Sequence, residues 1–301
     1  MQPTKKRRWR RVVLGVLVVL FAFLFYQWQA AIERNRSIPD QPFQIAENLY
    51  YVGSTGVTSF LLTGPEGHIL IDGGYPETGP LVIGSIAKLG FNIKDVKVLL
   101  NTHAHFDHAG GLKELQDSSG AQLWVSQGDA DIVASGGAGD RASFGPLRFL
   151  RLGRFPAARV DHRFNSDTTI RVGPIAVTAH LTPGHTPGCT TWSTLIHHRD
   201  RDLLAVDVCS LTLLPFMKLA DPQNYPGIRT DFEKSFQTLR ALPADIFLGS
   251  HGSFFSLARK RRERAKTADP VDPFIDHDGY LRLIDDAESS FRKELAKEQK
   301  K

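Results

Sequence analysis

Apolar residues along the chain form short runs that alternate with turn residues and with segments of helical period. Alternating or continuous apolar runs bounded by Gly, Pro or polar turns are typical of strands, whereas recurrence every three or four residues is typical of helices. The expected strands are 48–62, 68–71, 96–100, 123–126, 169–172, 175–181, 190–196, 203–208 and 245–248. The expected helices are 78–89, 107–116, 128–134, 231–242, 256–266 and 274–297.

The order of these elements repeats. Strands come first, helices and strands then interleave, and the pattern occurs twice along the chain. Two sheets that face each other, with helices on the outside, fit this order because every element then buries its apolar face. Residues 136–155 are rich in Gly and Arg and have no period, so we expect a long surface loop there.

The first 32 residues differ from the rest in composition. Six Lys and Arg residues lie between positions 5 and 11, and an almost unbroken apolar run follows from Val12 to Tyr26. This layout is typical of a secretory signal, and its length also approaches the roughly 20 residues of a membrane-spanning helix. We predict that residues 1–32 are a signal peptide or an inner-membrane anchor, with membrane association through residues 12–32. Residues 33–301 then form an exported, periplasmic domain, because the basic flank stays inside.

The positive charge is concentrated in this N-terminal segment. The whole chain has a formal net charge of +5. The six basic residues of the N-terminal segment carry more positive charge than this, so the rest of the chain is close to neutral. A nucleic-acid partner is therefore not indicated. A second basic run, at 259–266, lies in a helical pattern and is interpreted as a solvated helix face.

The chain has two cysteines, and they flank a pair of expected strands. Cys189 precedes the strand at 190–196, and Cys209 follows the strand at 203–208. A hairpin of these strands brings the two thiols near each other, and an oxidising compartment allows a disulfide. Strand register is not fixed by the sequence, so a disulfide and two free buried thiols both remain open.

Four side chains that can bind a metal lie within six positions, directly after the strand at 96–100. They are His103, His105, Asp107 and His108. Neutral imidazole and carboxylate are good ligands of Zn²⁺. Groups packed this tightly repel one another or require costly desolvation unless a cation holds them. The cluster predicts a metal site on a loop at the edge of a sheet.

Two further histidines leave strand ends in the same way. His185 lies in a Pro- and Gly-rich turn after the strand at 175–181, and His251 follows the strand at 245–248. Loops at one edge of a rigid sheet are where sites are assembled, so these residues bring the set to six candidate ligands. Catalytic zinc has three protein ligands and an open position, and six ligands divide into two such sets. The remaining histidines lack a clustered partner and are interpreted as structural: His68, His162, His180, His197, His198 and His277.

These motifs together resemble a known family. His-x-His-x-Asp-His, then Gly-His-Thr-Pro-Gly, then Ser-His-Gly is the order found in the metallo-β-lactamase superfamily, and the resemblance covers about residues 48–262. Residues 100–112 and 182–192 are similar in detail to the third subclass, B3. The resemblance implies an α+β fold, the four-layer αββα sandwich of that superfamily.

The resemblance also implies a ligand set and an activity. It assigns one zinc to His103, His105 and His185, and a second zinc to Asp107, His108 and His251. A hydroxide that bridges the two zinc ions would attack the lactam amide of a β-lactam antibiotic, with Asp107 orienting the hydroxide. The implied enzyme is a β-lactamase, EC 3.5.2.6, with a small-molecule substrate and a role in antibiotic resistance.

Two other residues take roles from the resemblance. Asp72 resembles a carboxylate that fixes the orientation of the ligands, although an Asp before Gly also commonly caps a turn. Ser210 resembles a contact to the substrate carboxylate. The chain departs from the family's frequent pattern at Cys189 and Val208, where Ser is common. Val208 cannot form a hydrogen bond, which bears on the substrate range.

Two other functions remain open. Lactonases and glyoxalase II-like thioesterases of the same fold commonly add an Asp that bridges both metals, and Asp207 lies one position away from that place. Export argues against the thioesterase, because glutathione thioesters are cytosolic. A non-catalytic, membrane-anchored metal-binding protein is a different class, and structural zinc sites are closed rather than open to water.

Overall fold

The computed structural model describes residues 9, 13–17, 19, 20, 23, 38, 40–140, 153–215, 217–220 and 226–300. The chain divides into two units, residues 1–38 and 39–301. Within the described residues, no helix is long and apolar enough to cross a membrane. The signal peptide or anchor expected over residues 1–32 falls mostly outside the described ranges and stays a prediction. Most of the loop expected at 136–155 also lies outside them.

The second unit contains two sheets. In the first sheet, strands β1 to β4 pair antiparallel and β4 to β7 pair parallel, in sequential order. Its strands are β1 (Phe43–Ala46), β2 (Leu49–Tyr51), β3 (Phe60–Leu62), β4 (His68–Ile71), β5 (Val96–Leu100), β6 (Gln122–Ser126) and β7 (His162–Phe164). The second sheet has the order β12-β11-β10-β9-β8, antiparallel except for the parallel pair β11 and β12. Its strands are β8 (Thr168–Val172), β9 (Ile175–Leu181), β10 (Thr190–His198), β11 (Arg201–Val208) and β12 (Ile246–Gly249).

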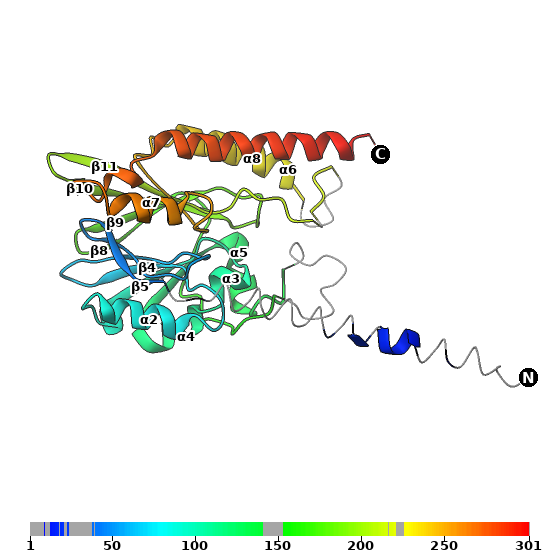
Figure 1. Cartoon of the computed structure of the whole chain (residues 1–301), viewed down its shortest axis with the longest axis horizontal. Helices are drawn as coiled ribbons and strands as arrows, with labels where there is room; N and C mark the ends of the chain where they lie inside the picture. Colours follow the sequence, from blue (N-terminus) through cyan, green and yellow to red (C-terminus); the bar gives the residue numbers. More distant parts are fainter. Residues whose placement is uncertain are drawn as a thin grey trace, which may run out of the picture. The chain divides into compact units, whose positions relative to one another are not determined.

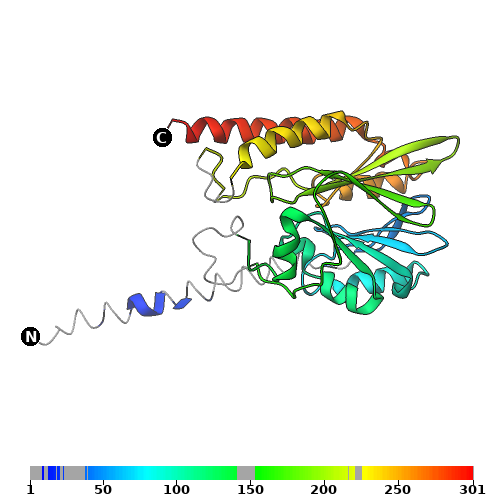
Figure 2. The same cartoon turned by 180° about the vertical axis from the view of Figure 1, so that it is seen from behind.

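The helices cover the outer faces of the sheets. Among the described residues they are α2 (Gly79–Lys88), α3 (Phe106–Ala109), α4 (Leu112–Ser119), α5 (Gln127–Ala134), α6 (Ile228–Ala241), α7 (Leu257–Arg264) and α8 (His277–Glu298), with short 3₁₀ turns at Ile93–Asp95 and Asp272–Phe274. Helices α2 to α5 lie against the first sheet, α6 and α8 lie against the second, and α7 packs on the 3₁₀ turn at Asp272–Phe274 (Figures 1 and 2). The predicted four-layer αββα sandwich is confirmed.

Apolar residues fill the spaces between these layers. One cluster joins the facing sheets and continues to α6 and α8, with Phe60, Trp192 and Phe232 almost fully buried. A second cluster packs α2, α4 and α5 on the outer face of the first sheet, around Leu99 and Leu112. Burying a large apolar side chain contributes about 1.5–3 kcal/mol, so these clusters hold the sheet edges in fixed positions.

Strand direction brings the ligand loops to one edge. Strands β4 and β5 are parallel, and β9, β11 and β12 share one direction in the second sheet, so their carboxyl ends point to the same side. The two edges are joined by backbone hydrogen bonds: the N–H of Thr190 donates to the carbonyl of Thr102 at 2.8 Å, and that of Thr58 donates to Ser250 at 3.1 Å. Side chains that follow these strands therefore converge.

The expected helix at 107–116 is two helices, α3 and α4, separated by Gly110 and Gly111. The turn at Asp72–Gly74 packs directly on this break: a Cβ on Gly111 would lie 2.2 Å from the carbonyl oxygen of Gly73. The prediction of a single helix was wrong because periodicity does not report this close contact between two backbones. The break turns α3 into a single short helix that carries Asp107 and His108.

Candidate metal centre

Four strand ends deliver the polar groups of the site. Strand β5 ends directly before His103 and His105, β9 leads to the turn that holds His185, and β12 leads to His251. Strand β4 ends at Ile71, directly before Asp72, whose φ of 60° lies in the left-handed region. Such a conformation is uncommon outside glycine and clusters at functional sites, where it is held by the surrounding structure.

His103, His105 and His185 form the first triad of candidate ligands. One ligand nitrogen from each lies within 4.8 Å of the others, and all three residues are buried. Their rings meet edge to face, with centroids 4.6–4.9 Å apart. Nε2 of His103 is buried without a hydrogen-bond partner among the described residues. A buried polar atom normally has a partner, and a metal ion bound by the three imidazoles would be the partner of this nitrogen.

Asp107, His108 and His251 form the second triad. Nε2 of His108 lies 3.1 Å from Nε2 of His251. Oδ2 of Asp107 lies 3.6 Å from the first nitrogen and 3.7 Å from the second, so the three ligand atoms surround one point. The rings of His103 and His108 have centroids 4.1 Å apart, which makes the two triads adjacent. The structure thus brings all six predicted ligands together.

Asp72 connects the two triads through hydrogen bonds. Its Oδ1 accepts hydrogen bonds from the backbone N–H of Thr102 and the amide of Asn101, at 2.7 and 3.0 Å. Its Oδ2 accepts from the Thr102 hydroxyl at 2.6 Å and from Nδ1 of His108 at 3.0 Å. Because the Thr102 hydroxyl donates to Asp72, it can accept from Nδ1 of His103, 3.1 Å away. Asp72 therefore orients a ligand in each triad, directly for His108 and through Thr102 for His103.

Asp72→Asn is expected to weaken metal binding about 10- to 100-fold, the usual effect of losing a hydrogen-bond partner behind a metal ligand. Asparagine tolerates the left-handed conformation. Its amide N–H₂, however, would replace an oxygen that now accepts hydrogen bonds, and would face the groups that donate them. Competition with a chromophoric chelator measures the affinity. Asp117→Asn, at an exposed ion pair with Lys113, is the matched control. Unchanged affinity in Asp72→Asn would show that Asp72 only caps a turn.

His185 is oriented by a residue that the sequence reasoning missed. Its Nδ1 donates to the backbone carbonyl of Thr212 at 2.8 Å and lies 3.2 Å from the Thr212 hydroxyl, which leaves Nε2 to the triad. The predicted substrate contact, Ser210, is buried, and its hydroxyl lies 3.0 Å from that of Thr212. In this conformation Ser210 therefore supports the loop that holds His185, and its contact with substrate stays a prediction.

The electrostatics of His103, His185 and Asp107 favour metal-binding protonation states. Burial would lower the pKa of His108, but Asp107 and Asp72 outweigh it and raise that pKa. Burial, followed by the neighbouring imidazoles, holds the pKa of His103 well below its ordinary value. Burial and His105 do the same for the pKa of His185. Burial would raise the pKa of Asp107, but the charges of His108 and His251 outweigh it and lower that pKa. His103 and His185 are thus neutral and Asp107 is ionised at neutral pH, and metals bind these forms.

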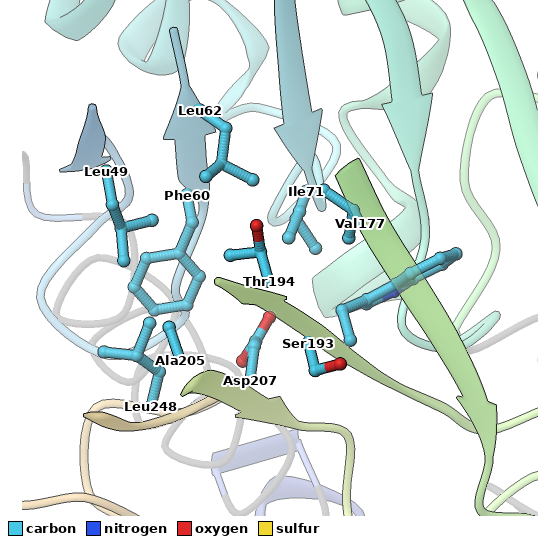
Figure 3. A pocket seen from close by; sticks show the side chains of 11 residues that line it. Leu49, Phe60, Leu62, Ile71, Val177, Ser193, Thr194, Ala205, Asp207 and Leu248 are labelled. Atoms are coloured by element: carbon cyan, nitrogen blue, oxygen red, sulfur yellow. The ribbon is translucent and has the colours of Figure 1, made fainter. Parts of the chain in front are cut away.

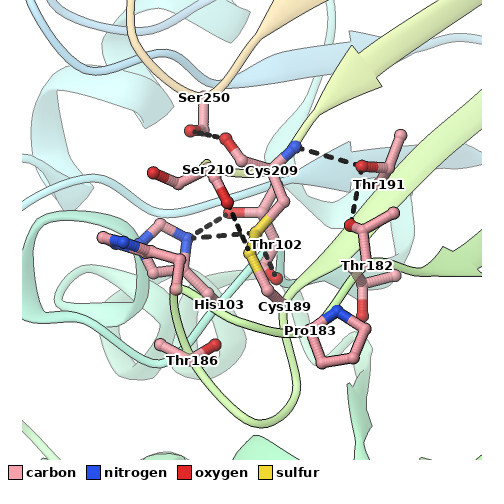
Figure 4. Close-up of a disulfide and its surroundings, with 12 residues drawn as sticks. Thr102, His103, Thr182, Pro183, Thr186, Cys189, Thr191, Cys209, Ser210 and Ser250 are labelled. Carbon is pink, nitrogen blue, oxygen red and sulfur yellow. Dashed lines mark hydrogen bonds between the residues drawn. A yellow bond between two sulfur atoms is a disulfide. The ribbon is translucent and has the colours of Figure 1, made fainter. Parts of the chain in front are cut away.

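Cys189 and Cys209 are joined by a disulfide, with Cα atoms 6.0 Å apart (Figure 4). The bridge lies directly behind the first triad, because Sγ of Cys209 is 3.7 Å from Nδ1 of His103. It fastens the end of the His185 turn to the end of β11. Of the two outcomes that the sequence left open, the structure has the disulfide.

The side chain of Asp207 lines a small internal cavity between the sheets, together with Phe60, Ile71 and Leu248 (Figure 3). Its Oδ1 is buried without a hydrogen-bond partner among the described residues. Burial, and secondly the charge of Asp72, raise the pKa of Asp207 well above its ordinary value. The groups of metal-type ligands found in the described chain do not include Asp207.

Asp207→Asn is expected to stabilise the protein near pH 8, because it removes a charge that the buried site disfavours; each unit by which folding raises the pKa of Asp207 corresponds to about 1.4 kcal/mol. Because the folded-state pKa is raised, ionisation favours the unfolded chain, and this contribution to stability falls as pH rises above about 4. The gain from the substitution should therefore shrink toward pH 4. Denaturant unfolding of both proteins at several pH values measures it. A pH-independent difference, or loss of activity, would contradict this assignment and favour a metal-bridging Asp207.

The other histidines lie outside the two triads. His198 pairs with Asp269 at 2.8 Å, and His180 lies 2.8 Å from the Ser193 hydroxyl. His162 belongs to β7 and stacks on Trp124. His277 begins α8 and donates to the carbonyl of Ala244 at 2.9 Å.

The chain is similar in sequence and in structure to known metallo-β-lactamases. Residues 52–204 match the family model described as the metallo-beta-lactamase superfamily. The native FEZ-1 metallo-β-lactamase from Legionella gormanii is 36% identical, with a TM-score of 0.82 over 87% of this chain and 98% of that one. BJP-1, a subclass B3 metallo-β-lactamase of Bradyrhizobium japonicum, is 32% identical, with a TM-score of 0.80 over 89% of this chain and 98% of that one.

Curated relatives match over shorter stretches. The hydroxyacylglutathione hydrolase GloC of Haemophilus influenzae is 28% identical over 188 residues, which is 60% of this chain and 79% of that protein. A further relative is matched over only 46% of its length. The family model covers the motifs at His103–His108 and His185, and the two solved structures match 87% and 89% of this chain. The chain belongs to the metallo-β-lactamase superfamily, and subclass B3 enzymes are among its structural neighbours.

Proposed function

We propose that this protein is a zinc-dependent β-lactamase that hydrolyses the lactam amide of β-lactam antibiotics. The observation that carries the proposal is the pair of adjacent triads, with six ligand groups at one edge of the two sheets. The likeness to FEZ-1 and BJP-1 over nearly their whole length supports lactams as the substrate class.

Each triad would hold one zinc ion. His103, His105 and His185 offer neutral nitrogens, and Asp107, His108 and His251 offer two nitrogens and a carboxylate. Bound zinc supplies Lewis acidity toward a carbonyl and lowers the pKa of water to about 7. Asp107, ionised and 18% exposed, can accept a hydrogen bond from a water molecule and orient it. The side chain of His251 is 28% exposed, so the second triad is open to solvent as a catalytic site requires.

A thioesterase or lactonase of the same fold is the second candidate, and the similarity to GloC favours it. Two observations weigh against it. Asp207 lines a cavity in the core and belongs to none of the groups of metal-type ligands in the described residues, and the disulfide suits an exported protein rather than one that meets cytosolic glutathione thioesters. We accordingly propose export to the periplasm, which fits the basic and apolar start of the chain.

One assay panel separates these candidates. The purified, zinc-loaded protein is offered a chromogenic cephalosporin, a carbapenem, a glutathione thioester and a homoserine lactone. The proposal predicts turnover of the two β-lactams and its loss after treatment with chelator. Turnover of the thioester or the lactone alone, by protein shown to contain zinc, would reject the lactamase and support the second candidate.

A further inference from the structure

Asp129 is a fully buried carboxylate that lies on α5, remote in sequence from every metal ligand. It accepts three hydrogen bonds. Oδ2 accepts from the backbone N–H of Ala104 at 2.9 Å and from the Thr186 hydroxyl at 2.7 Å, and Oδ1 accepts from the backbone N–H of Gly188 at 2.9 Å. Ala104 lies between His103 and His105, and Thr186 follows His185. One side chain thus joins the two loops that supply the first triad.

The start of α5 is packed closely on the His185 turn. The hydroxyl of Ser126 donates to the carbonyl of Gly188 at 2.6 Å. A Cβ on Gly128 would lie 2.5 Å from the carbonyl oxygen of Pro187, and one on Gly188 would lie 2.1 Å from the Ser126 hydroxyl. This approach requires glycine at both positions, because any larger residue would force the helix away from the turn. The contact between α5 and the turn is therefore built into both segments.

The buried position of the Asp129 carboxylate disfavours its charged form. Burial raises the pKa of Asp129, although its three donors and the charge of His105 oppose that rise. No salt bridge to Asp129 is found in the described residues. A buried acidic group without an ion pair is a poor source of stability. Its geometry serves another purpose, because it fixes the distance between two loops that must meet at one ion.

We propose that Asp129 is a positioning residue that sets the spacing of His103 and His105 relative to His185, and so determines the metal affinity of the first triad. The inference rests on the proposed zinc site but does not depend on the substrate. Ligands must be held within about 0.5 Å of productive geometry, which loops without such a link do not achieve. Loss of a supporting partner typically lowers metal affinity about 10- to 100-fold.

The test measures zinc affinity in two backgrounds that each keep one triad. His251→Ala disrupts the second triad and reports the first, whereas His185→Ala disrupts the first and reports the second. Asp129→Asn is added to each, because its amide N–H₂ would oppose one of the three donors. We expect zinc affinity to fall about 10- to 100-fold in the His251→Ala background and to stay unchanged in the His185→Ala background. Competition with a chromophoric chelator gives both values without any substrate.

Matched variants separate positioning from folding. Thr186→Val removes one hydroxyl bond at nearly constant volume and should weaken the first triad, whereas Thr186→Ser keeps the hydroxyl and should restore affinity. Asp131→Asn, on the exposed side of the same helix, is the control and should leave both affinities unchanged. The proposal would be overturned if zinc affinity fell equally in the two backgrounds. It would also be overturned if neither Asp129→Asn nor Thr186→Val lowered zinc affinity in any background. Failure of lactam hydrolysis with these affinity changes intact would overturn only the proposed function.

Discussion

Replacing His185 by alanine is expected to lower the kcat/KM for lactam hydrolysis by about a thousandfold or more. The first triad would keep only two ligands, and a metal ion that polarises a carbonyl contributes several kcal/mol to catalysis. Each 1.36 kcal/mol corresponds to a factor of ten in rate, so the loss of that contribution gives the expected magnitude. Steady-state hydrolysis of a chromogenic cephalosporin at saturating zinc measures it, together with the zinc content of the variant.

His197→Ala is the matched control. His197 is a histidine in the second sheet, but its side chain is 74% exposed and pairs with Asp202 in the adjacent strand. Its loss should leave hydrolysis within about a factor of two, because it is remote from both triads and surface substitutions typically change stability by less than 0.5 kcal/mol. Retention of most of the activity in His185→Ala would refute the assignment of His185 as a ligand.

Removal of the disulfide is expected to lower the free energy of unfolding by about 3 kcal/mol, the chain-entropy estimate for a loop of this size. The two cysteines are 20 residues apart in the sequence. The double variant Cys189→Ala/Cys209→Ala tests this by urea unfolding of the metal-free protein. Because the bridge lies beside His103, we also expect weaker zinc binding in the first triad.

A reducing agent provides the control. It should lower the stability of the natural protein toward that of the double variant and leave the double variant unchanged. Thiol titration of denatured, unreduced protein should find no free thiol. Two free thiols in that titration would show that the bridge does not form in the purified protein.

The strand pattern predicted where the six ligands meet. The runs at 96–100, 175–181 and 245–248 all end directly before His103, His185 and His251 or the turns that hold them, and strands of one direction end at one edge. The position of the ligands depends only on the spacing of apolar residues and on strand direction. Small errors in the predicted bounds of each element therefore do not change it. The two triads were assigned through the family resemblance, and the structure brings the same residues together.

The supporting contacts were not predictable in the same way. Asp129 bonds to Ala104 and Thr186, which are 25 and 57 residues away in the sequence, so no local pattern reports the contact. The direction of the Asp207 side chain depends on strand register, which a shift of one residue would reverse. Thr212 acts through its backbone carbonyl, and a backbone group leaves no signature in residue type.

Lactam hydrolysis, followed while zinc is returned to the metal-free protein, tests both the metal centre and the proposed activity. The rate of chromogenic cephalosporin hydrolysis is measured after each addition, and bound zinc is determined in parallel. We predict negligible hydrolysis without metal, a rise with added zinc, and a plateau when two zinc ions are bound per chain. Protein that binds two zinc ions and hydrolyses no β-lactam would contradict the proposed function, and protein that binds none would contradict the metal centre itself.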